Sequence, residues 1–474
     1  MKNNFSYGIE LREILKYNTE LLNSKYSQDI FLQNLEYLTK KTDDKYLQER
    51  AKGYIEYIKS DEVLKNYLGR LKYSCIEQEY IKKYFNLYCI EKREEERKEY
   101  NIIDLFCGAG GMSLGFIQEG FDINLACDFD ESCIETYTFN HPNTKSEYII
   151  KSDIKEIDND IKKYLSKDKV SLVIGGPPCQ GFSNANQQRL IDDPRNKLYK
   201  SFVNIVEQVK PKFFVMENVR GMLKVANQVK EDFEKVGYKV SYKILQARDF
   251  GVPQNRERLI FIGTYLSINP QEIFNLIEGE YSPKEYILKD AIADLNELEA
   301  STQKNNTNFI NEKNGGIVIK KINKNINDYL IKINNTSYIY PIIFNHQARY
   351  NNDRDIEIYS RLHQGDKSDD PKIADIMPYA SRSHIFKDKY YKLKESDVSK
   401  TITAHMKFDC NMYIHPTQAR GLTPREAARI QSYPDDYIFR GAFTKTYMQV
   451  GNSVPPLMAR GIAKVIKKIL QEEK

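Results

Sequence analysis

The sequence of 474 residues contains no tryptophan, no Cys-X-X-Cys pair and no long apolar run. Its seven cysteines form an odd set without the paired spacing of zinc sites, which argues against a disulfide framework and for a reducing compartment. No apolar stretch of about 18 residues is present to span a bilayer, and the first residues lack the apolar core of a signal peptide. We therefore expect a cytoplasmic protein with no metal site and no membrane partner.

A strong excess of charge of one sign is also missing. Lys and Arg number 71 and Asp and Glu 66, so the formal net charge is +5. This balance neither requires nor excludes a nucleic-acid partner, and any basic surface must be local. With 41% hydrophobic and 29% charged residues, the chain has the composition of a globular protein and the length of about three structural units.

From residue 100 onward, short apolar runs alternate with amphipathic stretches. The runs that read as strands are 101–106, 123–127, 147–150, 170–174, 213–216, 240–244 and 259–262. Apolar residues at offsets 0, 4, 7, 8 and 11 between Leu198 and Val209 predict one face of a helix. This alternation is typical of an α/β fold with a doubly wound parallel sheet, in which ligands bind at the carboxyl ends of the strands.

The regions on either side of this pattern differ from it. Residues 1–98 are polar with helical spacing of apolar positions and end in a charge run, which predicts a helical extension. Residues 267–400 lose the alternation and predict a separate, irregular domain. Regularity returns in a helix within Gly421–Tyr433, opened by Thr423 and a proline, and in a last amphipathic helix at Leu457–Leu470.

The segment DLFCGAGGMSLG, which begins at Asp104, follows the first strand and enters a helix. Its glycines let the backbone approach a ligand, and the helix N-terminus offers amide donors. The strict G-x-G-x-x-G pattern fails at Ser113, which disfavours NAD. Asp128 and Asp153 follow the next two strands, and each could be a cofactor contact or a helix cap. Three consecutive strand ends of this kind favour a nucleoside ligand.

Three further segments follow later strands. After the fourth strand, two prolines aim Cys179 away from the strand end, as a nucleophile requires, although a lone cysteine is more often a buried apolar residue. Glu217 ends the fifth strand and either faces the same cleft or is structural. Arg256 and Arg258 occupy alternate positions and so one face of a strand, where arginine is more often a surface residue.

In this order and spacing, the four segments closely resemble the DNA cytosine-C5 methyltransferase family: its F-x-G-x-G-G loop, P-C-Q nucleophile, E-N-V acid and Q-x-R-x-R strand. Residues 420–436 and 449–456 match the last two motifs of the family. The resemblance covers residues 100–266 and 400–466, touches 267–400 loosely and does not reach 1–98. It implies a Rossmann-like, S-adenosylmethionine-dependent methyltransferase. The domains implied are a helical N-terminal extension (1–98), a catalytic and cofactor-binding domain (99–266), a target-recognition domain (267–432) and a C-terminal segment returning to the catalytic domain (433–474).

The resemblance further implies methylation of carbon 5 of a flipped-out cytosine within a specific double-stranded DNA sequence, as in bacterial restriction-modification systems. Cys179 would add to C6, Glu217 would hydrogen-bond or protonate N3, and Arg256 and Arg258 would hold O2. Ser183 and Arg195 would contact DNA from a polar lid. The residues that would hold S-adenosylmethionine are Phe106, Gly108, Gly110, Gly111, Asp128, Phe129, Asp153, Ile154, Pro177, Asn452, Ser453 and Val454. At Phe129 the family often has tryptophan.

Two alternatives stay open at this point. One branch of the family methylates cytosine in transfer RNA, but its Cys-Phe-Thr tripeptide is absent here. Residues 1–98 could also make the enzyme a DNA-binding autoregulator. As partners we expect double-stranded DNA and, in function, a cognate restriction endonuclease, and we expect the protein to be a monomer.

Overall fold

The computed structural model describes residues 99–141, 144, 146–167, 169–178, 198–304, 313–323, 325–335, 342–378 and 388–473. Several expectations concern residues outside these ranges. They are the helical extension at 1–98, the nucleophile Cys179, and the two DNA contacts Ser183 and Arg195.

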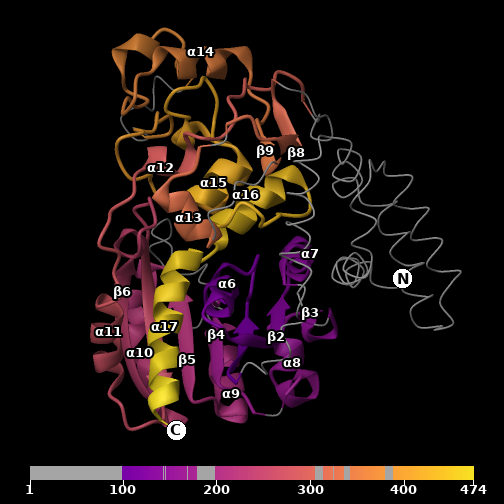
Figure 1. The fold of residues 1–474 in the computed structure, drawn as a ribbon, viewed down its shortest axis with the longest axis vertical. Helices are drawn as coiled ribbons and strands as arrows, with labels where there is room; N and C mark the ends of the chain where they lie inside the picture. The colour runs from indigo at the N-terminus through magenta and orange to yellow at the C-terminus, as the bar shows by residue number, and fades with distance from the viewer. Residues whose placement is uncertain are drawn as a thin grey trace, which may run out of the picture.

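A seven-stranded sheet organises the larger part of the described chain (Figure 1). Its strands are β1 (Asn101–Leu105), β2 (Asp122–Asp128), β3 (Ile149–Lys151), β4 (Leu172–Gly175), β5 (Phe213–Asn218), β6 (Lys239–Gln246) and β7 (Glu257–Thr264). The spatial order is β3-β2-β1-β4-β5-β7-β6. The first five strands in this order are parallel, whereas β7 runs antiparallel to both its neighbours.

The reversed strand β7 is a feature that the alternation of strands and helices did not predict. The link between β6 and β7 contains only the short 3-10 helix η6 (Ala247–Phe250). Two consecutive strands can pair in parallel only through a crossover of a dozen or more residues, usually a helix, and this link is too short for one. All seven strands expected from the sequence are nevertheless present, with ends shifted by a few residues.

Alternate residues of the strands enter two cores on opposite faces of the sheet. In β5, Phe213 and Val215 belong to one core, whereas Phe214 and Met216 belong to the other. The first face is covered by α6 (Gly111–Gln118), α7 (Glu131–Asn140), α11 (Pro270–Glu278) and α17 (Pro456–Glu472), the second by α8 (Ile154–Ile157), α9 (Leu198–Val209) and α10 (Ala226–Lys235). This confirms the doubly wound α/β fold.

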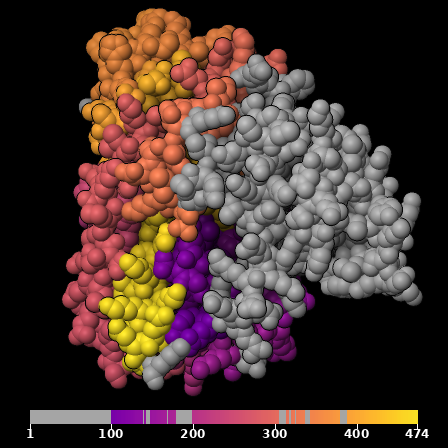
Figure 2. All heavy atoms as spheres, viewed as in Figure 1, coloured from indigo at the N-terminus to yellow at the C-terminus, as the bar shows by residue number. Residues whose placement is uncertain are grey.

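The C-terminal helix α17 lies against α6 and α11. In Figure 2 it is the yellow surface strip beside the indigo of the first strands and helices. The packing on α6 is close, since a Cβ atom added to Gly115 would lie 2.6 Å from the Cβ atom of Ala459. The end of the chain therefore supports the helix that follows the glycine-rich loop.

The irregular part of the chain forms a second layer beyond the carboxyl ends of the strands (Figure 1). Its elements are α12 (Leu288–Ile292), β8 (Gly315–Lys320), α13 (Asp328–Asn334), β9 (Ile342–Gln347), α14 (Asp353–Arg361), α15 (Pro424–Ile430) and α16 (Phe443–Asn452). The remaining 3-10 helices of the described chain are η2 (Ser146–Tyr148), η3 (Ile161–Tyr164), η5 (Arg220–Val225), η7 (Pro371–Ile373), η9 (Ala404–Lys407) and η10 (Asn411–Tyr413). Strands β8 and β9 pair antiparallel in a sheet of their own.

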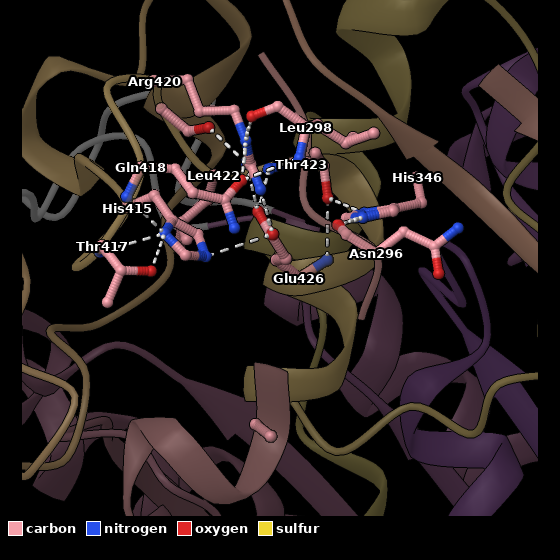
Figure 3. A network of polar contacts seen from close by, with 12 residues as sticks. Asn296, Leu298, His346, His415, Thr417, Gln418, Arg420, Leu422, Thr423 and Glu426 are labelled. Carbon is pink, nitrogen blue, oxygen red and sulfur yellow. Dashed lines mark hydrogen bonds and ion pairs between the residues drawn. The ribbon is translucent and has the colours of Figure 1, made fainter. Parts of the chain in front are cut away.

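A buried polar network holds the start of α15 (Figure 3). Thr423 Oγ1 accepts from the Glu426 backbone N–H at 3.2 Å, and Glu426 Oε2 accepts from the Thr423 N–H at 2.7 Å. The Thr-Pro pair predicted a helix start capped by Thr423, and the structure adds the reciprocal bond of Glu426 that makes it a capping box. Arg420 donates from both terminal nitrogens to Glu426, at 2.8 and 2.7 Å. Burial acts to raise the pKa of Glu426, but the Arg420 guanidinium holds that pKa below its usual range.

Two buried histidines complete this network. His346 Nδ1 lies 3.0 Å from Thr423 Oγ1, and its Nε2 lies 2.8 Å from the Asn296 carbonyl oxygen. His415 Nε2 lies 3.5 Å from Glu426 Oε1. Burial lowers the pKa of His346 to about 4 and that of His415 to about 3. Both rings are therefore neutral at physiological pH, and the network joins β9 and the 415–420 turn to α15.

In the part of the chain that the structure describes, every helix is too short or too polar to traverse a bilayer.

Candidate active site

The loop between β1 and α6 has a backbone that ordinary residues rarely adopt. Phe106, Gly108 and Gly110 have φ values of 59°, 53° and 80°. The Gly108 N–H donates to Asp128 Oδ2 at 2.8 Å, and the Asp130 N–H donates to Asp128 Oδ1 at 2.8 Å. The loop therefore lies directly against the end of β2, as the two sequence segments predicted.

The glycines of this loop face different surroundings. A Cβ atom on Gly110 would lie 2.6 Å from His141 Cε1, and one on Gly111 would lie 2.5 Å from the Val454 carbonyl oxygen. A Cβ atom on Gly108 would meet nothing within 4 Å. One side of the loop is thus packed against α7 and the C-terminal segment, while the backbone at Gly108 borders open space.

The other residues expected to hold the cofactor lie around this open space or support it. Phe129 follows Asp128 and is 74% exposed, which is unusual for a large apolar side chain. The Ser152 N–H donates to the Asp128 carbonyl at 3.1 Å, which puts the third strand end beside the second. Asp153 caps α8 through Lys155 N–H at 3.1 Å, while Ile154 is buried. Asp153 is therefore a helix cap in this structure. A contact between Asp153 and a cofactor stays a prediction.

The C-terminal motif returns to the glycine loop. Ser453 is buried, and its hydroxyl accepts from Tyr433 at 2.6 Å and donates to the Gln449 carbonyl at 2.8 Å. Val454 meets Gly111 as described above, while Asn452 is exposed. The sequence segment at 452–454 and the loop at 108–111 therefore meet in space.

Glu217 and Arg258 form an ion pair between the adjacent strands β5 and β7. Arg258 Nε lies 2.5 Å from Glu217 Oε1, and the two side chains are only 12% and 10% exposed. Burial lowers the pKa of Arg258, while the Glu217 carboxylate acts to raise it. A Cβ atom on Gly176 would lie 2.8 Å from Glu217 Oε2. The carboxyl group therefore faces the segment that leads through Pro177 towards residue 179.

Arg256 has different surroundings from Arg258. It is fully buried, and its terminal nitrogens donate to the carbonyls of Ile402 at 2.7 Å, Gly451 at 3.0 Å and Ser453 at 2.7 Å. Burial lowers the pKa of this guanidinium. The structure thus gives Arg256 three backbone partners and joins it to the C-terminal motif. Its expected contact with a base remains a prediction that these contacts do not support.

Two residues of the site were not singled out from the sequence. Asn218 donates from its side chain to the Pro177 carbonyl at 3.0 Å and so fixes the strand exit that leads to residue 179. Gln254 accepts from the Ile402 N–H at 2.8 Å and also pairs with Gln431. Asn218 lies in the E-N-V motif and Gln254 in the Q-x-R-x-R motif. Their structural roles follow only from their partners, which are distant in the sequence.

The model of the C-5 cytosine-specific DNA methylase family matches residues 100–468. The chain belongs to this family. The resemblance read from the motifs and the Rossmann-like methyltransferase fold are thereby confirmed, and so is the enzyme class, a DNA (cytosine-5-)-methyltransferase. Membership also implies a methyl donor and a DNA substrate.

Relatives of this methylase cover most of its length. The chain is 34% identical to the type II methyltransferase M1.HphI of Haemophilus parahaemolyticus, over 78% of this chain and 87% of that protein. It is 36% identical to the type II methyltransferase M.DdeI of Desulfomicrobium norvegicum, over 77% and 88%. A solved structure of a candidate DNA modification methyltransferase encoded within a prophage (E. coli) superposes with a TM-score of 0.60 at 26% identity, over 79% of this chain and all of that one.

Proposed function

We propose that this methylase transfers a methyl group from S-adenosylmethionine to carbon 5 of a flipped-out cytosine in a specific double-stranded DNA sequence. The observation that carries the proposal is the buried Glu217–Arg258 pair, whose carboxyl group faces the Gly176–Pro178 segment. The nucleophile of the family motif, Cys179, follows this segment directly. A stacked base cannot reach such a recessed carboxyl group, so the target nucleotide must leave the duplex.

The chemistry assigns a separate task to each of these side chains. Carbon 5 of cytosine is a poor nucleophile, so the Cys179 thiolate adds to C6 and pushes an electron pair into the ring. Glu217 hydrogen-bonds or protonates N3 and so neutralises the charge that develops there. Arg258 orients Glu217 and stabilises O2 of the base. C5 would then accept the methyl group, with S-adenosylhomocysteine as the leaving group. Loss of the C5 proton would let Cys179 depart as thiolate and restore the aromatic ring.

The glycine loop and its surroundings fit S-adenosylmethionine, which supplies the electrophilic methyl group when bound. Open space at Gly108 lets the backbone approach the ligand, and the exposed ring of Phe129 offers a stacking face for adenine. The Asp128 carboxylate, held by two backbone N–H groups, is suited to accept hydrogen bonds from ribose hydroxyls. Pro177, Ile154 and the residues 452–454 complete the wall of this proposed site.

For other parts of the chain we propose roles without assigning individual atomic contacts. Residues 267–432 would read the DNA sequence, residues 433–474 would return to the catalytic domain, and Ser183 and Arg195 would contact DNA from a lid. For Arg256 we propose a positioning role, because three backbone carbonyls already surround it. The type II names of the relatives support protection of host DNA alongside a cognate restriction endonuclease. A monomeric state belongs to the same proposal.

Covalent trapping tests this function. Duplex DNA containing 5-fluorocytosine at the target position should form a stable adduct with the wild-type protein only when S-adenosylmethionine is present, because the fluorine blocks proton loss from C5. Cys179→Ser should form no adduct. Cys75→Ser, which lies outside the family match, is the control and should trap normally. Trapping of RNA but not of DNA would overturn the proposal. Bisulfite sequencing of plasmid from an expressing host would identify the target sequence.

A further inference from the structure

Three buried glutamines lie between the start of β7 and the C-terminal segment. Gln254, Gln431 and Gln449 are each at most 1% exposed. Glutamine is mostly an exposed residue, and a buried amide group is stable only where its polar atoms have partners. The partners of these side chains belong to segments that lie far apart in the sequence.

Gln254 and Gln431 form a bridge of two side chains with a single direction. The Ile402 N–H donates to Gln254 Oε1 at 2.8 Å, and Gln254 Nε2 donates to Gln431 Oε1. Gln431 Nε2 then donates to the carbonyls of Val450 at 3.2 Å and Ser453 at 2.7 Å. The backbone groups at the two ends fix the orientation of both amides, because an amide oxygen only accepts and an amide nitrogen only donates. A side chain without both a donor and an acceptor therefore interrupts the bridge.

One end of the bridge is fixed to the strand that carries Arg258. The Ile402 carbonyl accepts from Arg256 at 2.7 Å, and the Thr401 hydroxyl donates to the Asn255 carbonyl. Residues 255 and 256 directly precede β7, in which Arg258 is the second residue. A cytosine held by Arg258 therefore restrains the backbone at this end of the bridge.

The other end of the bridge is fixed to the glycine loop. A Cβ atom on Gly111 would lie 3.1 Å from Ser453 Cβ and 2.5 Å from the Val454 carbonyl oxygen. The Ser453 hydroxyl donates to the Gln449 carbonyl at 2.8 Å, and Gln449 Oε1 accepts from Thr136 of α7 at 2.7 Å. Helix α7 follows β2, whose last residue is the proposed ribose ligand. A cofactor in the glycine loop therefore restrains this end.

We propose that Gln254 and Gln431 are positioning residues that make the cofactor and DNA bind cooperatively, because each ligand orders one end of the bridge between them. This rests on the proposed function, since it places the methyl donor at the glycine loop and the cytosine beside Arg258. The bridged segments 401–403 and 453–455 lie outside helices and strands. A first ligand that orders them lowers the ordering cost for the second, and linkage makes the effect mutual.

Isothermal titration calorimetry measures this cooperativity without turnover. S-adenosylhomocysteine, which has no methyl group to transfer, is titrated into the full chain with and without a duplex that contains the target sequence. The ratio of the two dissociation constants is the coupling factor. We expect the duplex to tighten binding to the wild type by about 10-fold or more, within the usual range of coupling between two sites.

Two variants interrupt the bridge from either side. Methionine is about as long as glutamine but offers no donor, so Gln431→Met and Gln254→Met should each reduce the coupling factor at least about threefold. The double variant should reduce it no further, because both glutamines serve one bridge. Arg256 still joins Ile402 to Ser453 in these variants, which keeps the two segments together.

Tyr329→Phe is the matched control. It removes a buried hydrogen bond from the Tyr329 hydroxyl to the Arg429 carbonyl, two residues before Gln431 but outside the bridge. Its coupling factor should equal that of the wild type, even where its stability falls.

The outcomes separate the two proposals. A wild-type coupling factor of one, an equal loss of affinity with and without DNA in the bridge variants, or an equal fall in Tyr329→Phe would overturn the role of the bridge and leave the proposed function intact. Failure of the wild type to bind either ligand would count against the proposed function itself. If Gln431→Met does not fold, Gln254→Met decides the question, because it leaves the contacts of Gln431 with Val450 and Ser453 in place.

Discussion

The Glu217–Arg258 pair is the clearest residue-scale feature of the site, since both charges are buried and each is the other's partner. Glu217→Gln keeps the shape of the side chain but removes its charge and its acidity. We expect covalent trapping of 5-fluorocytosine DNA to slow by roughly 10²–10⁴-fold, the usual contribution of a general acid. The variant should also lose about 3 kcal/mol of stability, because Arg258 stays buried without a counter-ion. Single-turnover trapping and urea denaturation measure the two effects.

Glu257 provides the matched control for this variant. Glu257 precedes Arg258 in β7, its side chain is more exposed than that of Glu217, and it binds Arg220 and Gln246 instead. Glu257→Gln should therefore trap DNA at the wild-type rate. Equal trapping rates for Glu217→Gln and the wild type would contradict the role assigned to Glu217.

Asp104 has a consequence for stability that is independent of any ligand. Its pKa is about 8 in the folded protein against 3.8 as the ordinary value, so folding near neutral pH requires proton uptake. This contribution to stability is complete below about pH 4 and is lost as the pH rises towards 8. Asp104→Asn has no such requirement. It should exceed the wild type in stability by about 1 kcal/mol or more at pH 7 and approach it at pH 4, as measured by urea denaturation in the absence of ligand. A less stable variant at pH 7 would refute this.

Sequence motifs predicted which candidate site residues lie together, whereas the tasks of these residues stay predictions. Gly108, Asp128, Glu217 and Arg258 were all found from local spacing after strand ends, and the structure brings them to one edge of the sheet. The partners of Arg256 lie 146 to 197 residues away in the chain. No local pattern indicates that three distant carbonyls will surround a side chain, so only the folded structure separates Arg256 from Arg258.

At the scale of elements, the start of α15 makes the protein sensitive to acid. Unfolded His346 has its ordinary pKa near 6.5, whereas burial lowers that pKa to about 4 in the fold. The unfolded chain therefore binds a proton that the folded chain excludes, and stability falls as the pH drops below about 6.5. The limiting slope is about 1.4 kcal/mol per pH unit for each such histidine.

His346→Gln should reduce this slope between pH 6.5 and 4.5, as followed by urea denaturation at several pH values. The exposed residue His363 gives the control, since His363→Gln leaves the buried network untouched. An unchanged slope in His346→Gln would show that the acid sensitivity arises elsewhere. Absolute stability can fall in this variant through its contacts with Thr423 and Asn296, so the slope is the quantity to compare.

Elements with strong local signals were predicted well. Helix α9 has the predicted bounds, and α15 begins at its capping box. The direction of β7 could not be predicted, because it depends on the absence of a crossover helix after β6 and not on the composition of either strand. Likewise, nothing in the composition of residues 267–400 indicated which of its apolar runs would pair as β8 and β9.

At the scale of the whole molecule, the C-terminal segment of the methylase packs against elements from the start of its sheet. Helix α17 covers α6, and residues 451–454 meet both the glycine loop and Arg256. The glycine loop, the start of β7 and the segment at Ile402 are thus packed together, although they lie far apart in the sequence. A near-neutral chain can bind DNA in this architecture, because only the surface around the shared edge needs to be basic.

A substitution of Arg256 can decide whether this side chain positions the C-terminal segment or contacts the target base. A lysine at position 256 keeps the charge but cannot reach three carbonyl oxygens at once. If Arg256 positions the C-terminal segment, Arg256→Lys should lose about 3 kcal/mol of stability and raise the KM for S-adenosylmethionine. At saturating cofactor, kcat should stay within about 10-fold of the wild type. Arg258→Lys, the matched variant, should instead lower kcat at saturating cofactor, because Arg258 pairs with Glu217. A fall in kcat with unchanged KM in Arg256→Lys would favour the direct base contact expected from the sequence and exclude the positioning role.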